Sequence, residues 1–192
     1  MELAAAAAEL FTAQGVVATT AEEIAARAGI SLRTFYRYFR TKEEAIAPLL
    51  EIGAEQWQAA LRSAPADSDG KDAVAQAIRH VLNPQDREAA EGMELVRDLL
   101  IAAEEDPELA GVWAVVNARS ENELLAVMAE RLGSEDCLLV RLHATAATAA
   151  IRVALEAWAA GVTPAPPGDD GEPRHPASSL AVEAFRRLSA GL

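Results

Sequence analysis

Hydrophobic residues recur at helical spacing along most of the chain. Leu3, Ala7, Leu10 and Phe11 share one face of the first segment at intervals of three to four residues, which is the pattern of an amphipathic helix. No segment predicts a strand, because the short apolar run 112–116 sits inside a helical pattern. The fold class is therefore predicted to be all-α, with helices expected over residues 2–14, 20–29, 32–40, 41–62, 71–82, 85–104, 107–132, 135–161 and 177–190.

Residues that typically begin or end helices mark these boundaries. Thr20 precedes Glu23 by three residues and Thr41 precedes Glu44 by three, so each pair is expected to form a capping box. Ser31 is expected to cap the third helix. The segments 63–70 and 162–176 have the composition of loops.

The second and third expected helices are separated only by Ala28-Gly29-Ile30-Ser31. Two helices joined by a short turn that contains glycine form a helix-turn-helix. On a helical wheel of the third helix, Phe35 and Phe39 fall together, with Leu32 beside them, and the basic residues fall opposite. A recognition helix needs this division, because it must dock on its own domain and present hydrogen-bond donors to the DNA major groove.

Charge is distributed unevenly. The net charge of −13 argues by itself against a nucleic-acid partner. Residues 63–192, however, hold 22 acidic and 11 basic side chains, whereas residues 24–42 hold no acid. A cationic island of this kind can bind phosphate, although a solvated helix face would look the same. Its members are Arg27, Arg33, Arg37, Arg40 and Lys42.

The sequence offers little for catalysis or for a membrane. The single cysteine, Cys137, excludes an internal disulfide and a cysteine-based metal cluster. The three histidines are scattered, and no metalloprotease, phosphate-loop or nucleophile-elbow motif is present. We therefore expect no enzyme activity, no cofactor and no metal. Neither a signal peptide nor an uncharged apolar run of about 18 residues is found, so a cytoplasmic protein without membrane contact is expected.

Residues 3–46 resemble the DNA-binding domain of the TetR family of bacterial repressors. The resemblance is carried, in order and without a gap, by Ala8-Glu9-Leu10-Phe11, Gly15, Thr19-Thr20, Ile24-Ala25, Ala28-Gly29-Ile30-Ser31, Thr34-Phe35-Tyr36-Arg37-Tyr38-Phe39 and Lys42-Glu43-Glu44. The rest of the chain is similar to the family only in helical pattern and length. The resemblance implies a helix-turn-helix domain over residues 1–46 and a helical ligand-sensing and dimerisation domain over residues 47–192.

The resemblance also implies roles for individual residues. Arg33 is expected to contact a base, Thr34 and Tyr36 to contact phosphate, and Lys42 to meet the DNA backbone. The wheel places Leu32 and Tyr38 nearer the core than the other members of this surface. The complete DNA-facing set is Thr20, Leu32, Arg33, Thr34, Tyr36, Arg37, Tyr38 and Lys42.

In the C-terminal region, the resemblance implies that the last two helices form a four-helix bundle with a second subunit. The apolar stripes fit this interface and fit an intramolecular core about equally well. The interface residues expected are Leu142, Ala146, Ala149, Val153, Ala157, Ala181, Ala184, Phe185 and Leu188.

A cavity for a small-molecule effector is expected among the helices of residues 42–132. Large apolar and polar side chains there are its candidate walls, although side chains of these types are more often plain core. Arg97 is included because a buried charge needs a partner. The candidates are Trp57, Met93, Arg97, Trp113 and Asn117.

The function predicted is a dimeric repressor that binds a palindromic operator and is released by an effector through a population shift. Many family members carry a basic arm before the first helix. This chain begins almost at that helix, so either the arm is absent or the true start lies upstream. An absent arm predicts weaker binding and a shallower salt dependence. The alternatives are an enzyme, a helical binding protein that has lost DNA binding, and an activator.

Overall fold

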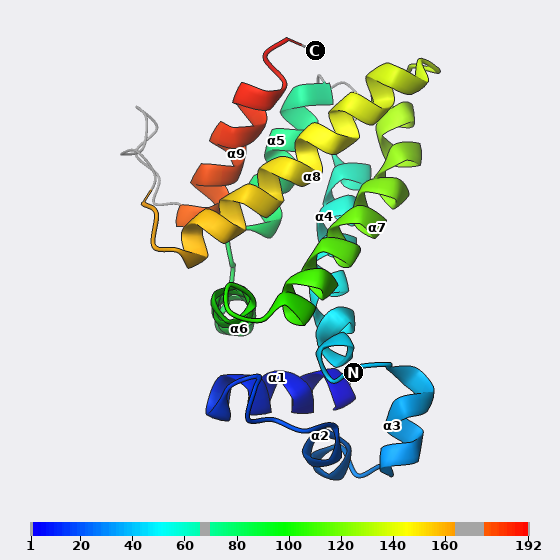
Figure 1. Cartoon of the computed structure of the whole chain (residues 1–192). Helices are drawn as coiled ribbons and strands as arrows, with labels where there is room; N and C mark the ends of the chain where they lie inside the picture. Colours follow the sequence, from blue (N-terminus) through cyan, green and yellow to red (C-terminus); the bar gives the residue numbers. More distant parts are fainter. Residues whose placement is uncertain (1, 66–69, 164–174, 192) are drawn as a thin grey trace.

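The computed structural model describes residues 2–65, 70–163 and 175–191. These residues form nine α-helices and one short 3-10 helix, η1, and contain no strand (Figure 1). The bounds are α1 Glu2–Gln14, α2 Ala21–Arg27, α3 Leu32–Tyr38, η1 Glu43–Ile46, α4 Ala47–Ser63, α5 Gly70–Val81, α6 Arg87–Ala103, α7 Pro107–Leu132, α8 Cys137–Ala159 and α9 Pro176–Leu188. The all-α prediction is confirmed.

The first three helices and η1 pack around a small core of their own. Phe35 and Ile24 are completely buried there, and Phe11 nearly so. The alanines of α1 are mostly buried as well, and their small side chains let neighbouring backbones approach closely. Fully burying an apolar side chain of this size contributes roughly 1.5–3 kcal/mol, so these residues hold the three short helices together.

Caps set the ends of the short helices. The hydroxyl of Thr20 accepts a hydrogen bond from the amide of Glu23, whose carboxylate accepts one from the amide of Thr20. Ser31 accepts from the amide of Thr34 at the start of α3. Both expected caps are confirmed. Gly29 adopts a φ of +70° in the turn between α2 and α3, a conformation that costs other residues about 1–2 kcal/mol.

The segment after α3 differs from the prediction. The third helix ends at Tyr38 because Phe39 is extended (φ −128°, ψ 144°). Thr41 does accept from the amide of Glu44, but the Glu44 carboxylate accepts from the amide of Arg40. The turn that follows is the 3-10 helix η1, and α4 begins only at Ala47. Pro48 explains the break, since it lacks the amide that would bond to the carbonyl of Glu44.

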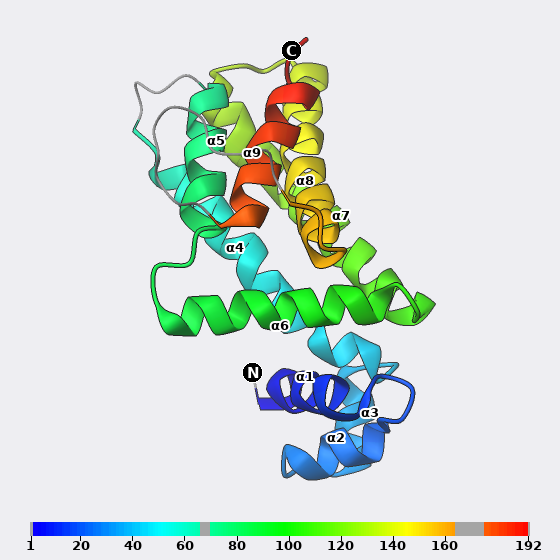
Figure 2. The same ribbon diagram turned by 90° about the vertical axis from the view of Figure 1, so that its left-hand side faces the viewer.

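The C-terminal helices form a bundle in which α8 is central. It packs between α7 and α9, and its C-terminal end lies next to α6 (Figures 1 and 2). Among the described helices, α8 alone is long and apolar enough to cross a membrane, and half of its most apolar stretch is buried in the molecule. The core of the bundle includes Leu61, Ile78, Leu124, Met128 and Phe185.

Helix α6 lies across the base of this bundle, directly over α1 (Figure 2). Leu99 of α6 and Leu109, Val112 and Val116 of α7 belong to the same core cluster as Phe11 and Phe35. The core of the N-terminal helices is thus completed by the other part of the chain. The boundary expected between residues 46 and 47 falls where η1 meets α4.

The loops expected over residues 63–70 and 162–176 lie largely outside the described residues. The flanking helix ends agree with the prediction to within two residues: α5 begins at Gly70 and α9 at Pro176.

Candidate nucleic-acid interface and effector cavity

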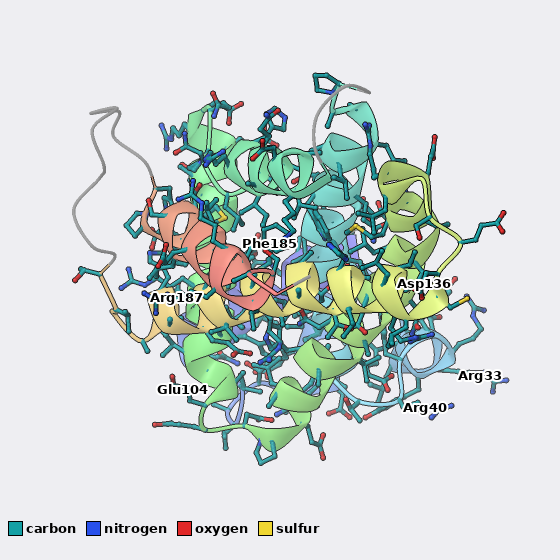
Figure 3. The ribbon with its side chains drawn as sticks, turned by 90° about the horizontal axis from the view of Figure 1, so that it is seen from above. Arg33, Arg40, Glu104, Asp136, Phe185 and Arg187 are labelled. Atoms are coloured by element: carbon teal, nitrogen blue, oxygen red, sulfur yellow. The ribbon has the colours of Figure 1, made fainter. Side chains whose placement is uncertain are left out.

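Helix α3 presents a polar and cationic face to solvent. Its inner side is anchored by Phe35, which is completely buried and stacks against Phe39 with ring centroids 5.5 Å apart. Its outer side carries exposed Arg33, Tyr36 and Arg37. Arg33 and the nearby Arg40 extend away from the body of the molecule (Figure 3). The expected division into an anchored face and a donor-rich face is therefore present in the fold.

Arg37 and Tyr38 form a pair on this surface. A guanidinium nitrogen of Arg37 donates to the Tyr38 hydroxyl at 3.0 Å, and the guanidinium lies 4.9 Å from the centre of the Tyr38 ring. Tyr38 is 62% exposed, so the wheel was wrong to place it near the core. The extended backbone at Phe39 ends the helix directly after Tyr38, so no further helical turn covers this ring. Leu32 is half-buried, as the wheel predicted.

Two threonines of the expected DNA-facing set, Thr20 and Thr34, already form hydrogen bonds within the domain. The Thr20 hydroxyl lies 3.0 Å from the Glu23 carboxylate and accepts from the Glu23 amide. The hydrogen bond from the Thr20 backbone, followed by that from its hydroxyl, lowers the pKa of Glu23. The hydroxyls of Thr34 and Ser31 lie 2.8 Å apart. Both threonines therefore stabilise helix N-termini.

Lys42 points inward. Its ammonium donates to the carbonyls of Val16 and Thr19 at 2.6 and 2.8 Å and lies 3.7 Å from the carboxylate of buried Glu43. These contacts join η1 to the turn between α1 and α2, and they leave the side chain 23% exposed. The structure thus gives Lys42 a structural position, which differs from the exposed phosphate contact expected from the resemblance. The position of the turn explains the difference: Val16 and Thr19 are buried, and the ammonium of Lys42 supplies donors to their carbonyls.

The expected interface residues of α8 and α9 divide into two groups. Ala146, Ala181 and Phe185 are buried in the bundle, where they serve the intramolecular core that the sequence left open. Leu142, Val153 and Leu188 are 42–50% exposed, and Ala149, Ala157 and Ala184 are half-buried. An apolar surface therefore runs along the outside of these two helices.

A cavity of about 570 Å³ lies among α4, α5, α6, α7 and α8. Four expected residues border it: Trp57, Met93, Trp113 and Asn117. Leu50, Leu99 and Val116 also border it and belong to the core cluster of the N-terminal helices. The cavity thus shares a wall with the part of the molecule that positions α3.

Arg97 does not border the cavity. Its guanidinium lies 5.4 Å from the centre of the Trp158 ring and 3.5 Å from the Glu94 carboxylate, and the side chain is 36% exposed. Leu100, one turn further along α6, is buried in the bundle core, whereas the guanidinium of Arg97 extends to Trp158 and stays partly exposed.

Two features of the site went unpredicted. Thr148 borders the cavity from α8, and its buried hydroxyl lacks a hydrogen-bond partner; a threonine in an alanine-rich helix was the available signal. Glu108, at the start of α7, faces buried Glu43 of η1. The hydrogen bond that protonated Glu108 shares with Glu43, followed by the Glu43 charge, raises the pKa of Glu108. No sequence pattern reports a pairing between residues so far apart.

Comparisons with known proteins show which regulators this chain is similar to. Residues 3–46 match the sequence model described as "Bacterial regulatory proteins, tetR family". The HTH-type transcriptional regulator TcmR of Streptomyces glaucescens is 34% identical over 128 residues, which cover 65% of this chain. Residues 3–46 are therefore similar to the DNA-binding domain of TetR-family regulators. The region matched covers 56% of TcmR, so the chain spans little more than half of that relative.

Solved structures share the fold of this chain along nearly its whole length. Thermus thermophilus FadR, a TetR-family repressor in complex with lauroyl-CoA, superposes with a TM-score of 0.59 at 22% identity, covering 100% of this chain and 93% of that one. The repressor AlkX of Dietzia sp. has a TM-score of 0.59 at 20% identity, with coverage of 98% and 94%. The multidrug binding protein EbrR, complexed with imidazole, has a TM-score of 0.55 at 21% identity, with coverage of 97% and 92%.

Proposed function

We propose that this protein is a transcriptional repressor that binds a two-fold symmetric operator as a homodimer and leaves it when a small molecule fills the cavity. The observation that carries the proposal is the outer face of α3. Arginines and tyrosines are exposed there, while the opposite face is fixed by a fully buried phenylalanine. Such a helix can enter a major groove without losing its hold on its own domain.

Electrostatics supports DNA as the partner. The only basic surface expected from the sequence lies on the helix-turn-helix, and the remainder of the chain is acidic. Phosphate attraction therefore favours one orientation, with α3 towards DNA and the bundle away from it. The match of residues 3–46 to the TetR-family sequence model supports the same partner.

The exposed apolar surface of α8 and α9 supports a dimer. Leu142, Val153 and Leu188 would be covered by the same surface of a second copy, as a two-fold interface requires. Two recognition helices could then reach successive major grooves about 34 Å apart.

The shared wall of the cavity supports release by an effector. A molecule that pushes on Leu99 or Val116 presses on the core beneath α6, and that core carries α1 and α3. An effector that fits better when the recognition helices are wrongly spaced would shift the population to that state. FadR with lauroyl-CoA and EbrR with imidazole are relatives in fold that hold ligands. The site of action would be the cytoplasm, where the bacterial chromosome lies.

Selection of binding sites from a random pool of double-stranded DNA tests the proposal. The parent protein is expected to enrich a palindrome. A variant with Arg33→Glu and Arg37→Glu should enrich nothing, because these exposed charges would then repel phosphate. A variant with Arg87→Glu on α6 is the control and should behave as the parent, since Arg87 is 91% exposed and pairs with Glu91 on the surface. A pool that stays random at low salt would overturn DNA binding and favour a binding protein that keeps only the cavity.

A further inference from the structure

Most of the side chains that border the cavity are apolar. Of the described residues around it, none is Lys, Arg or His. Two of the three tryptophans, Trp57 and Trp113, form part of its wall. An anionic group taken into this space would lose its hydration without gaining a cation, which is strongly unfavourable.

Four arginines adjacent in sequence to residues of the cavity wall are paired with carboxylates outside it. Arg97 follows Val96 and pairs with Glu94, and Arg87 precedes Glu88 and bonds to Glu91 at 2.6 Å. Arg119 precedes Ser120 and bonds to Glu51 and Glu123 at 2.8 and 3.0 Å. Arg152 follows Ile151 and bonds to Glu156 at 3.0 Å. A ligand anion would have to compete with these pairs.

The charged groups that do border the cavity are acids. Asp86 and Glu88 stand at the start of α6, and both are exposed, which puts them at the opening. One oxygen of Asp86 accepts from the amide of Ala89, and its second oxygen stays available. A cation at the opening would meet two carboxylates, whereas an anion would be repelled by them.

Polar groups inside the cavity are few and neutral. The hydroxyl of Thr148 is buried and lacks a partner. Asn117 donates through its amide nitrogen to the carbonyl of Trp113 at 2.8 Å, so its side-chain oxygen can still accept. A buried polar group without a partner is costly, and a ligand hydroxyl that bonds to these two groups would remove that cost.

We propose that the cavity selects a lipophilic effector that carries no anionic group: a neutral molecule whose polar end bonds to Thr148 and Asn117, or a cation whose charge faces Asp86 and Glu88. This rests on the proposed effector role of the cavity. It narrows that role to one class of ligand and excludes carboxylates and phosphates.

Three amphiphiles with one chain length test the charge preference. Dodecyltrimethylammonium, dodecanol and dodecanoate are titrated below their micelle concentrations into the full-length protein without DNA, and binding is followed by tryptophan fluorescence. The cation and the alcohol are expected to bind at least about tenfold more tightly than the carboxylate, a conservative figure for an unpaired buried charge. Equal or tighter binding of dodecanoate overturns the proposal, and so does a failure of all three to bind.

Two variants separate the two ends of the cavity. Asp86→Asn with Glu88→Gln keeps a side chain that can cap α6 and should weaken only the cation. Thr148→Val keeps the shape of the side chain and should weaken only the alcohol. Glu104→Gln, an exposed acid at the far end of α6 (Figure 3), is the control. Equal effects of a variant on both probes would contradict this assignment.

The selection of operator DNA is independent of these titrations. If the protein enriches a palindrome and also binds dodecanoate at least as tightly as the other two probes, the proposed ligand class is rejected and the proposed role as a regulator is kept. If the cation and the alcohol bind as expected but the DNA pool stays random, the ligand class is supported and the role as a DNA-binding regulator is rejected.

Discussion

Arg33 and Arg37 differ in what they contact in the absence of DNA. Arg37 is held by the ring and hydroxyl of Tyr38, whereas no hydrogen bond or ion pair is found for Arg33 among the described residues. A free guanidinium can form the two parallel hydrogen bonds that read a guanine. Arg33→Ala should therefore cost about 1–3 kcal/mol in operator binding and relax the preference at one position of each half-site.

The measurement is a repeat of the DNA selection with Arg33→Ala, and Arg40→Ala is the comparison. Arg40 lies beyond the end of α3, so its loss should weaken binding to all sequences similarly. A parental sequence preference in the Arg33 variant would show that another side chain reads the base.

Lys42 should act on stability. Lys42→Met removes the charge that bonds to Val16 and Thr19 and neighbours buried Glu43. Hydrogen bonds from charged groups are worth roughly 1.5–3 kcal/mol, so urea unfolding should show a loss of about 2 kcal/mol. Arg40→Met, at an exposed neighbour, should change little. Unchanged stability with weaker DNA binding would instead support the phosphate contact implied by the resemblance.

At the level of elements, helices with clear caps and stripes could be predicted from sequence. The bounds of α1 and α7 were predicted to the residue, because Gly15 and Gly133 end them in the left-handed conformation. The start of α4 was wrong, since the capping box at Thr41 was given more weight than Pro48. The fate of Lys42 was missed for another reason: its partners lie in a turn more than twenty residues away, and such pairing is set by tertiary packing.

The contact between η1 and α7 should depend on pH. Because the pKa of Glu108 is raised above its ordinary 4.5 by Glu43, the folded protein binds this proton more tightly than the unfolded chain. The resulting stabilisation is complete below about pH 4.5 and is lost as pH rises through the raised value. Glu108→Gln keeps a donor towards Glu43 without the charge, so it should raise the melting temperature at pH 7.

The difference in melting temperature between Glu108→Gln and the parent should shrink as pH falls towards 4.5, because Glu108 of the parent then becomes protonated. Thermal unfolding of both proteins between pH 7 and pH 4.5 measures this difference. Glu105→Gln is the control, because Glu105 is an exposed acid between α6 and α7 with no comparable partner in the described residues. Its difference in melting temperature from the parent should not change with pH. An advantage that is absent at pH 7, or constant with pH, would argue against a shared proton between η1 and α7.

At the level of the whole molecule, the apolar stripes of α8 and α9 could be predicted from the sequence. Whether each stripe packs within one subunit or against a second subunit could not. Periodicity reports that a residue faces something apolar, and it does not report which chain supplies that surface. The fold resolves part of this, since Ala146, Ala181 and Phe185 are buried within one subunit. Leu142 and Val153 remain exposed, and exposure of large apolar groups on one surface is typical of an interface.

Leu142→Glu with Val153→Glu should therefore separate the subunits without unfolding them. Each subunit keeps its own core, while two glutamates per copy would meet their equivalents across a two-fold axis. Sedimentation should show a monomer with the parental helix content. Operator affinity should fall about 100-fold or more, because the second half-site would no longer be bound by a linked recognition helix.

The control is Val17→Glu, which adds the same charge at an 89% exposed valine in the turn between α1 and α2. It should remain dimeric, since this turn lies at the opposite end of the molecule from α9 (Figure 1). A double variant that stays dimeric would show that the two copies meet elsewhere. If it became monomeric yet bound the operator as the parent does, one recognition helix would suffice, and the exposed surface of α8 and α9 would have another partner.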